Sequence, residues 1–302
     1  MNKQKQKNSL LLCICLMFIV AKAFNQIPNF STVPNLHAGD ALHITRLIAN
    51  GTSISGGKVI AWFPKDALST EHMSKLLDTL NKAIAAAEHL INAPHTWQVH
   101  TKEMSYTFYF RADSFISHAS GAGFVSIPFW RIQQGKAPWL HEVMHEMLNT
   151  KKGNWLSSTI SEDIWLRNMP LWLSEGLPDY ISLLVSQQQQ LPLFDVFANT
   201  LIVDPDSICK NDLKGDKADS ILTFIGTKGV MPQLLGKQRR LYAPAFYHCS
   251  CSFVKFLSEK IGLDALVASI AAYPEEMKTL EKKLSRPIDT LKKQWLINIK
   301  GK

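Results

Sequence analysis

The sequence has no apolar run of the length that a membrane-spanning helix needs, and no concentration of basic residues. The uncharged stretch from Leu10 to Ala21 has twelve residues, whereas a spanning helix needs about 20. The formal net charge is +8, but four lysines lie within residues 1–23 and the other basic residues are scattered. We therefore expect no stable membrane span and no nucleic acid partner.

The first 23 residues have the three parts of a secretory signal peptide. Three lysines precede the apolar stretch, and Ala21-Lys22-Ala23 after it is similar to an A-x-A cleavage site. Cys13 and Cys15 are followed by further hydrophobic residues, so they form no lipid-attachment box. Removal of residues 1–23 takes away four lysines and no acidic residue, which changes +8 to +4. We expect the mature protein to be secreted or periplasmic.

Only three cysteines remain beyond the expected cleavage site: Cys209, Cys249 and Cys251. Cys249 and Cys251 are two residues apart on an expected helix, so they point in different directions and do not favour a bond with each other. In an oxidising compartment Cys209 could pair with either of them, and free thiols are the alternative. A cysteine nucleophile is disfavoured, because the adjacent His248 is the only evident histidine partner.

The pattern H-E-x-x-H occurs once, as His141-Glu142-Val143-Met144-His145. Histidines four residues apart lie on one face of a helix, so both rings can reach a single Zn²⁺. Glu142, on the adjacent edge, can take a proton from a zinc-bound water and pass it to a leaving amine. Apolar neighbours predict that this helix is mostly buried, where unpartnered histidines and a glutamate would be costly. A metal ion is the partner that this pattern indicates.

A third ligand is expected on a second helix, which begins after Pro170 and repeats apolar residues at helical spacing. Glu175 lies on this helix among apolar neighbours, where an unpartnered carboxylate is unfavourable. Asp179, one turn further on, faces the same way and could accept the other ring N–H of a ligand histidine, preferably His141. The alternative is that Glu175 is favoured by the helix dipole near the N-terminus, but the dipole does not explain Asp179.

Together, His141-Glu142-x-x-His145 and Trp172-Leu173-x-Glu175-Gly176-x-x-x-Tyr180 resemble the gluzincin clan of zinc metallopeptidases. The resemblance covers roughly residues 58–262 and implies one Zn²⁺ per chain and a peptide or protein substrate. It implies that the zinc ligands are His141, His145 and Glu175. It also implies that Glu142 is the general base and that Asp179 holds a ligand histidine in place.

The resemblance also implies a substrate-binding strand just before the zinc helix, for which the candidates are Gly121, Ala122, Gly123 and Phe124. Glycines beside a strand let another backbone approach, and an edge strand can pair with an extended peptide. A plain turn followed by a strand is the alternative. The chain lacks the Gly-x-Met-Glu-Asn stretch of the aminopeptidase branch, so an aminopeptidase is not favoured.

A tyrosine on a later helix is the remaining element that the resemblance implies. In the gluzincins this hydroxyl donates to the oxyanion of the tetrahedral intermediate. Tyr247 matches that place, His248 and Tyr242 are competing candidates, and a core tyrosine is the other interpretation. Ser250 stands where family members commonly have glycine.

The pattern along the chain predicts an α+β fold with two lobes. Residues 24–186 would form an N-terminal lobe with a small mixed or antiparallel sheet and the zinc-binding helices, and residues 187–302 a mostly helical C-terminal lobe. Strands are expected at 58–63, 96–100 and 106–111, and helices at 69–91 and at 247–261, before Gly262. Residues 24–57 are interpreted as a lead-in with one short strand, and residues 263–302 as amphipathic helices.

Three aspartates in the segment 193–240, which are Asp204, Asp206 and Asp212, do not have the spacing of an EF-hand. We interpret them as part of a solvated loop, and the other N-terminal-lobe histidines, His118 among them, as surface or core residues. The sequence thus predicts an exported zinc metallopeptidase. The alternatives are a non-catalytic exported binding or assembly protein on a peptidase scaffold, and a zinc hydrolase that acts on other bonds.

Overall fold

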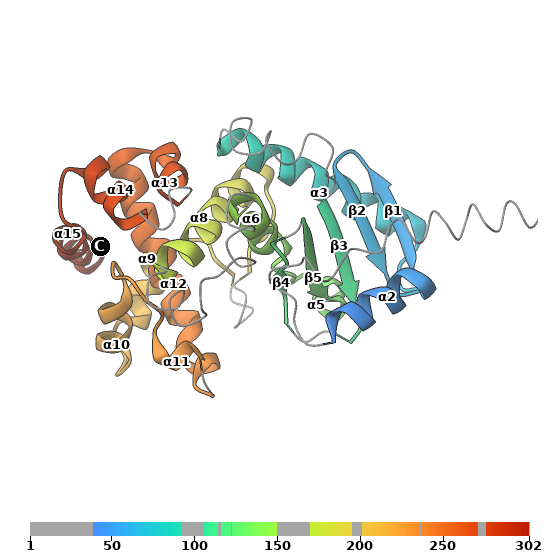
Figure 1. The fold of residues 1–302 in the computed structure, drawn as a ribbon, viewed down its shortest axis with the longest axis horizontal. Coiled ribbons are helices and arrows are strands. Elements are labelled where there is room, and N and C mark those ends of the chain that lie inside the picture. Colours follow the sequence, from blue (N-terminus) through green and yellow to red (C-terminus); the bar gives the residue numbers. More distant parts are fainter. Residues whose placement is uncertain are drawn as a thin grey trace, which may run out of the picture.

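The computed structural model describes residues 39–91, 106–113, 116–121, 123–149, 170–194, 201–235, 237–270 and 276–301. The expected signal peptide at 1–23, the expected strand at 96–100 and Ala122 lie outside these residues. The fold is α+β, as predicted: helices flank a mixed sheet at one end of the molecule, and the other end is helical (Figure 1). None of the described helices combines the length and the hydropathy needed to cross a membrane.

Within the described residues the sheet has five strands, in the order β1-β2-β3-β5-β4. Their bounds are Thr52–Gly56 (β1), Val59–Phe63 (β2), Tyr106–Arg111 (β3), Phe124–Pro128 (β5) and His118–Ala119 (β4). β2, β3 and β5 run parallel to one another, whereas β1 and β4 are antiparallel to their neighbours. The mixed sheet and the strands expected at 58–63 and 106–111 are therefore confirmed.

Alternate side chains of the strands face two different layers, as the period of two requires. On one face Trp62, Tyr109 and Phe124 pack against α2 (Asp40–Asn50). On the other face Phe63, Phe108 and Phe110 join a core that includes α3 (Thr70–Leu90) and α6 (Trp139–Asn149). The sheet is thus the middle of three layers, and α6 lies on the same face as α3.

Helix α3 forms as its sequence predicts. The Ser69 side chain accepts a hydrogen bond from the backbone N–H of His72, and Glu71 lies in the first turn, where the helix dipole favours a negative charge. Its buried stripe runs from Met73 to Ala87. By contrast, the interpretation of residues 24–57 as a lead-in with one short strand is only partly right. The segment contains the strand β1, but it also contains the helix α2, which the sequence did not predict. Only Asp40, Ile44 and Ile48 of α2 are buried, and no side chain caps its start, so its sequence signal is weak.

The helical end of the molecule is organised around α8 (Leu171–Gln189) and α12 (Arg239–Ile261), which pack along each other (Figure 1). α12 ends at Gly262 as expected but begins well before Tyr247. One hydrophobic core continues from the sheet through α6 and α8 to α12. The other helices of the described segments are α5 (Phe129–Gln133), α9 (Pro205–Asp212), α10 (Ala218–Phe224), α11 (Pro232–Leu235), α13 (Leu263–Ile270), α14 (Glu276–Leu284) and α15 (Ile288–Gly301).

A disulfide between Cys209 and Cys249 joins α9 to α12, and Cys251 is a buried free thiol. This selects one of the two pairings that the sequence left open. The interpretation of the three aspartates as a solvated loop is wrong, because Asp204 caps α9 and Asp206 is buried. The Asp206 carboxylate accepts hydrogen bonds from the Ser252 hydroxyl and the Lys255 ammonium, each at 2.7 Å. Burial lowers the pKa of Lys255, but the bond to Asp206 outweighs it and raises the pKa to about 12.

Candidate metal centre

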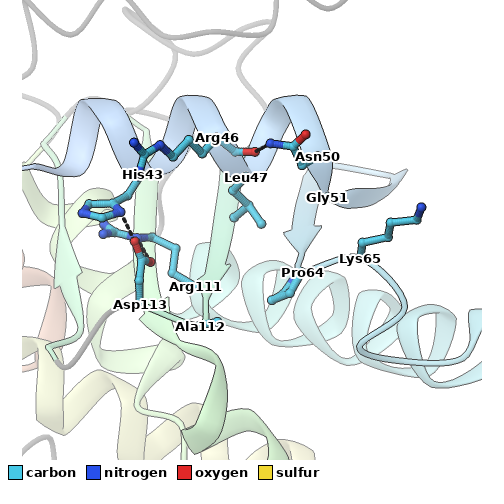
Figure 2. A pocket seen from close by; sticks show the side chains of 10 residues that line it. All are labelled: His43, Arg46, Leu47, Asn50, Gly51, Pro64, Lys65, Arg111, Ala112 and Asp113. Carbon is cyan, nitrogen blue, oxygen red and sulfur yellow. Dashed lines mark hydrogen bonds and ion pairs between the residues drawn. The ribbon is translucent and has the colours of Figure 1, made fainter.

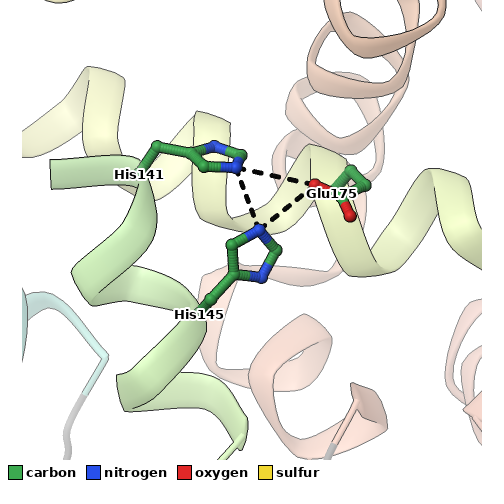
Figure 3. A group of neighbouring side chains, drawn as sticks. All are labelled: His141, His145 and Glu175. Atoms are coloured by element: carbon green, nitrogen blue, oxygen red, sulfur yellow. Dashed lines mark hydrogen bonds and ion pairs between the residues drawn. The ribbon is translucent and has the colours of Figure 1, made fainter. Parts of the chain in front are cut away.

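Three side chains from α6 and α8 converge on one point (Figure 3). Nε2 of His145 lies 2.9 Å from Nε2 of His141 and 3.1 Å from Oε2 of Glu175. The third separation, between Nε2 of His141 and Oε2 of Glu175, is 3.5 Å. The two imidazoles are one helical turn apart, and their ring planes are nearly perpendicular, at 82°. Two nitrogens from α6 and one oxygen from α8 thus face a shared space, although His145 and Glu175 are thirty positions apart in sequence.

The spacing of these atoms fits a tetrahedral metal ion. Bonds of about 2.0–2.1 Å at tetrahedral angles separate two ligand atoms by about 3.3 Å, and the three observed separations lie on both sides of that value. Two histidines and a glutamate are also a donor set that catalytic zinc uses. The side chains of His145 and Glu175 are 13% and 14% exposed, whereas that of His141 is 3% exposed. The group therefore opens to solvent on the side of His145 and Glu175.

A fourth residue, Asp179, fixes the orientation of the His141 ring. Its Oδ1 lies 2.6 Å from Nδ1 of His141, and both side chains are buried. Burial lowers the pKa of His141, but Asp179 and Glu175 outweigh burial and hold the pKa well above its usual range. The pKa of Glu175 is raised by burial but lowered more strongly by His145 and His141, so it lies well below its usual range.

Glu142 lies on α6 next to His141 and is buried. Burial raises the pKa of its carboxyl group, and the nearby His141 and His145 lower the pKa by less than burial raises it. His118 of β4 is also close enough to act electrostatically on Glu142. The structure therefore brings Glu142 and the metal-ligand candidates into one electrostatic environment.

Helices α8 and α12 approach each other closely beside this group. A Cβ atom on Gly176 would lie 2.6 Å from the carbonyl carbon and oxygen of Ser250, so only glycine fits the present helix separation. Ser250 is fully buried and donates its hydroxyl to the carbonyl of Phe246 at 2.7 Å. Gly176, the residue after Glu175 on α8, thus forms a close contact with Ser250 of α12.

Tyr247 of α12 lies beside the metal-ligand candidates. Its ring centroid lies 6.1 Å from that of His141. Burial raises the pKa of Tyr247, and Glu175, which shares a hydrogen bond with it, raises the pKa further. His248 instead forms a 2.8 Å hydrogen bond through Nδ1 to Asp212 of α9, and the ring of Tyr242 lies under the ammonium of Lys217. Among the three candidates from the sequence, the structure thus brings Tyr247 to the group.

The segment predicted as a substrate-binding edge strand is instead a turn followed by an inner strand, because β5 pairs with β3 on one side and with β4 on the other. Gly121 and Gly123 both have positive φ angles, of 72° and 88°. Phe124, the first residue of β5, is buried between the sheet and α2, where it packs edge-on against Tyr109. The turn is fastened to α6 by Glu146, a residue that sequence reasoning did not single out. A fourth ionisable side chain inside a buried helix, after His141, Glu142 and His145, is the signal that could have identified it.

A second group of buried charges, which sequence reasoning also missed, connects α2 to the sheet. The guanidinium of Arg111 donates to Asp40, to Ser126 and, through Nε at 3.1 Å, to Asp113. Figure 2 shows Asp113 between Arg111 and His43, at one end of a surface pocket under α2. The second oxygen of Asp40 lies 2.8 Å from Nε2 of His118. Burial raises the pKa of Asp40, but His118 and Arg111 outweigh it and hold the pKa well below its usual range.

Comparisons with protein-family models, with curated proteins and with solved structures give no match for this chain. Any functional interpretation therefore depends on the residues of the site and their geometry.

Proposed function

We propose that this chain is an exported zinc metallopeptidase of the gluzincin type, which hydrolyses peptide bonds. One observation carries the proposal: Nε2 of His141, Nε2 of His145 and a carboxylate oxygen of Glu175 lie within 4.8 Å of one another. The bond from Asp179 to the far nitrogen of His141 supports it, because zinc-bound histidines almost always donate their other N–H to a carboxylate or carbonyl.

The residues around this group have the chemistry that hydrolysis requires. When bound, zinc supplies a Lewis acid that polarises the scissile carbonyl and acidifies a water molecule. The Glu142 carboxylate takes a proton from the attacking water and passes it to the nitrogen of the leaving amine. The Tyr247 hydroxyl donates a hydrogen bond to the oxyanion of the tetrahedral intermediate. Asp179 accepts the hydrogen on Nδ1 of His141, so Nε2 is the atom that would bind the metal.

The substrate backbone would bind along β4. This strand ends the sheet order among the described residues, and it packs against α6. In Figure 1, β4 lies on the side of the sheet that faces α6 and α8. An extended peptide that adds to such an edge gains main-chain hydrogen bonds that depend little on its sequence.

The disulfide supports export. Disulfides persist in oxidising compartments and are rare in the cytosol of most organisms. Cys209 and Cys249 are both buried and 40 residues apart in sequence. Their bond therefore supports a secreted or periplasmic location, as the N-terminal segment leads us to expect.

Cleavage of an unbiased peptide library is the experiment that tests the proposal. The wild-type chain should cut peptides, a chelator should stop the cleavage, and added Zn²⁺ should restore it. Glu142→Gln serves as the matched control, because it keeps the ligands and removes the base. Binding of peptides without cleavage by the zinc-loaded wild-type chain would contradict the proposal and favour a non-catalytic binding protein.

A further inference from the structure

We propose that Glu146 is a positioning residue that holds β4 in a fixed place beside the group of His141, His145 and Glu175. The inference rests on the proposed function, in which β4 receives the substrate backbone. It assigns a role to a carboxylate that neither holds the metal nor takes part in proton transfer.

The contacts of Glu146 all lead to the turn between β4 and β5. Its Oε1 accepts hydrogen bonds from the backbone N–H of Gly121, at 2.6 Å, and from the hydroxyl of Ser120, at 3.1 Å. Its Oε2 accepts from the backbone N–H of Gly123 at 2.7 Å. Glu146 is 3% exposed, so water does not compete for these bonds, and charge-assisted bonds of this length are strong.

The turn is shaped so that its donors converge on one carboxylate. Gly121 and Gly123 both adopt left-handed φ angles, which residues with a side chain rarely take. Ser120 links the turn to the sheet, because its hydroxyl also accepts the backbone N–H of Phe124 at 3.2 Å. The donors thus come from both strand ends of the turn and hold them to α6.

This fastening matters because β4 has little stability of its own. The strand has only two residues, which pair with β5 as His118↔Ser126 and Ala119↔Val125. Asp40 anchors one end of it through His118, and Glu146 anchors the other end through the turn. Without the second anchor, so short a strand would be free to shift relative to α6.

Glu146 directly follows His145 on α6, so one turn of helix fixes both the ligand ring and the strand edge. Side chains of consecutive helical residues point about 100° apart, which lets one face the metal group while the next faces the turn. The distance from a peptide on β4 to the proposed metal is therefore set by a single rigid element.

The test compares Glu146→Gln with Asp206→Asn. In Glu146→Gln the new side chain would keep one carbonyl oxygen, but its NH₂ group would face a backbone N–H, so one of the two glycine donors loses its acceptor. Asp206 is a similarly buried carboxylate that bonds Ser252 and Lys255 on α12, away from α6 and β4. Zinc content, amide hydrogen exchange and the kinetics on a peptide that the wild type cleaves are measured for both variants.

For Glu146→Gln we expect unchanged zinc content and an exchange of the Gly121 and Gly123 amides that is faster by about tenfold or more. We expect KM to rise about tenfold while kcat changes little, because a shifted β4 would form fewer main-chain hydrogen bonds with the peptide in the bound state and in the transition state alike. Asp206→Asn should change neither the exchange of the turn nor KM, even if its melting temperature falls equally.

Unchanged exchange of the turn or an unchanged KM in Glu146→Gln would overturn the inference. Loss of zinc, or a fall in kcat alone, would assign Glu146 a merely structural role and overturn it as well. If the wild-type chain holds no zinc and cuts no peptide, the proposed function fails. The exchange data still show in that case whether Glu146 holds β4, so the two failures are distinguishable.

Discussion

Asp179 and His141, 38 residues apart in sequence, are joined by a buried hydrogen bond of 2.6 Å. Because a carboxylate oxygen accepts, Nδ1 of His141 carries a hydrogen toward Asp179, and Nε2 is the ring atom that faces Glu175 and His145. The orientation of a proposed ligand therefore depends on a residue that is not itself a ligand.

Substitution Asp179→Asn tests this dependence. We expect zinc affinity to fall about 10–100-fold, because the amide can no longer fix the His141 tautomer as the carboxylate does. Titration with a competing chelator measures the affinity. Asp212→Asn is the matched control, since Asp212 makes the same kind of bond to His248. Equal zinc affinities for wild type and Asp179→Asn would show that the bond does not serve the metal.

Substitution Glu142→Gln separates proton transfer from metal binding. We expect the variant to keep its zinc and to lose about 10²–10⁴-fold in kcat, because a carboxamide cannot take the proton of the attacking water. Metal analysis and steady-state kinetics on one cleaved peptide measure the two quantities. Wild-type turnover by Glu142→Gln would remove the proposed general base.

Substitution Gly176→Ala tests the contact between α8 and α12. The added methyl group meets the Ser250 backbone at 2.6 Å, so the helices must separate at an expected cost of about 1–3 kcal/mol in the free energy of unfolding. Denaturant unfolding measures this cost. Gly301→Ala is the control, because nothing lies within 4 Å of its added Cβ atom and alanine is the better helix former. A Gly176→Ala variant as stable as Gly301→Ala would contradict the close packing.

Removal of the disulfide tests the link between α9 and α12. The bond closes a loop of 40 residues, and its loss in Cys209→Ala/Cys249→Ala should lower the free energy of unfolding by about 2–4 kcal/mol. A reducing agent should lower the melting temperature of the wild type but not of the double variant. If reduction affects both proteins alike, the bond is not between these two cysteines.

The sequence predicts most of the elements that carry the candidate site, because their signals are local. The spacing of His141 and His145 defines a helix face, and Pro170 with the apolar repeat after it defines the second helix. The patterns at 58–63 and 106–111 identify strands because alternation and β-branched or aromatic residues act over a few positions.

The missed features depend on contacts between distant residues. The sequence of α6 can indicate a buried Glu146, but not that its partners are the backbone N–H groups of Gly121 and Gly123. Asp40 and Arg111 are 71 positions apart, so no local pattern shows that they pair. The burial of Asp206 likewise depends on α12. Single-sequence patterns do not contain such pairings.

The zinc content of the purified chain is the most direct test of the central claim. The protein is purified without chelators, dialysed against metal-free buffer and analysed for all divalent metals beside a Glu175→Ala variant. We predict about one zinc ion per wild-type chain and far less in the variant, since three protein ligands are needed to hold zinc firmly. A wild-type chain that retains no zinc after incubation with an equimolar amount would contradict the account.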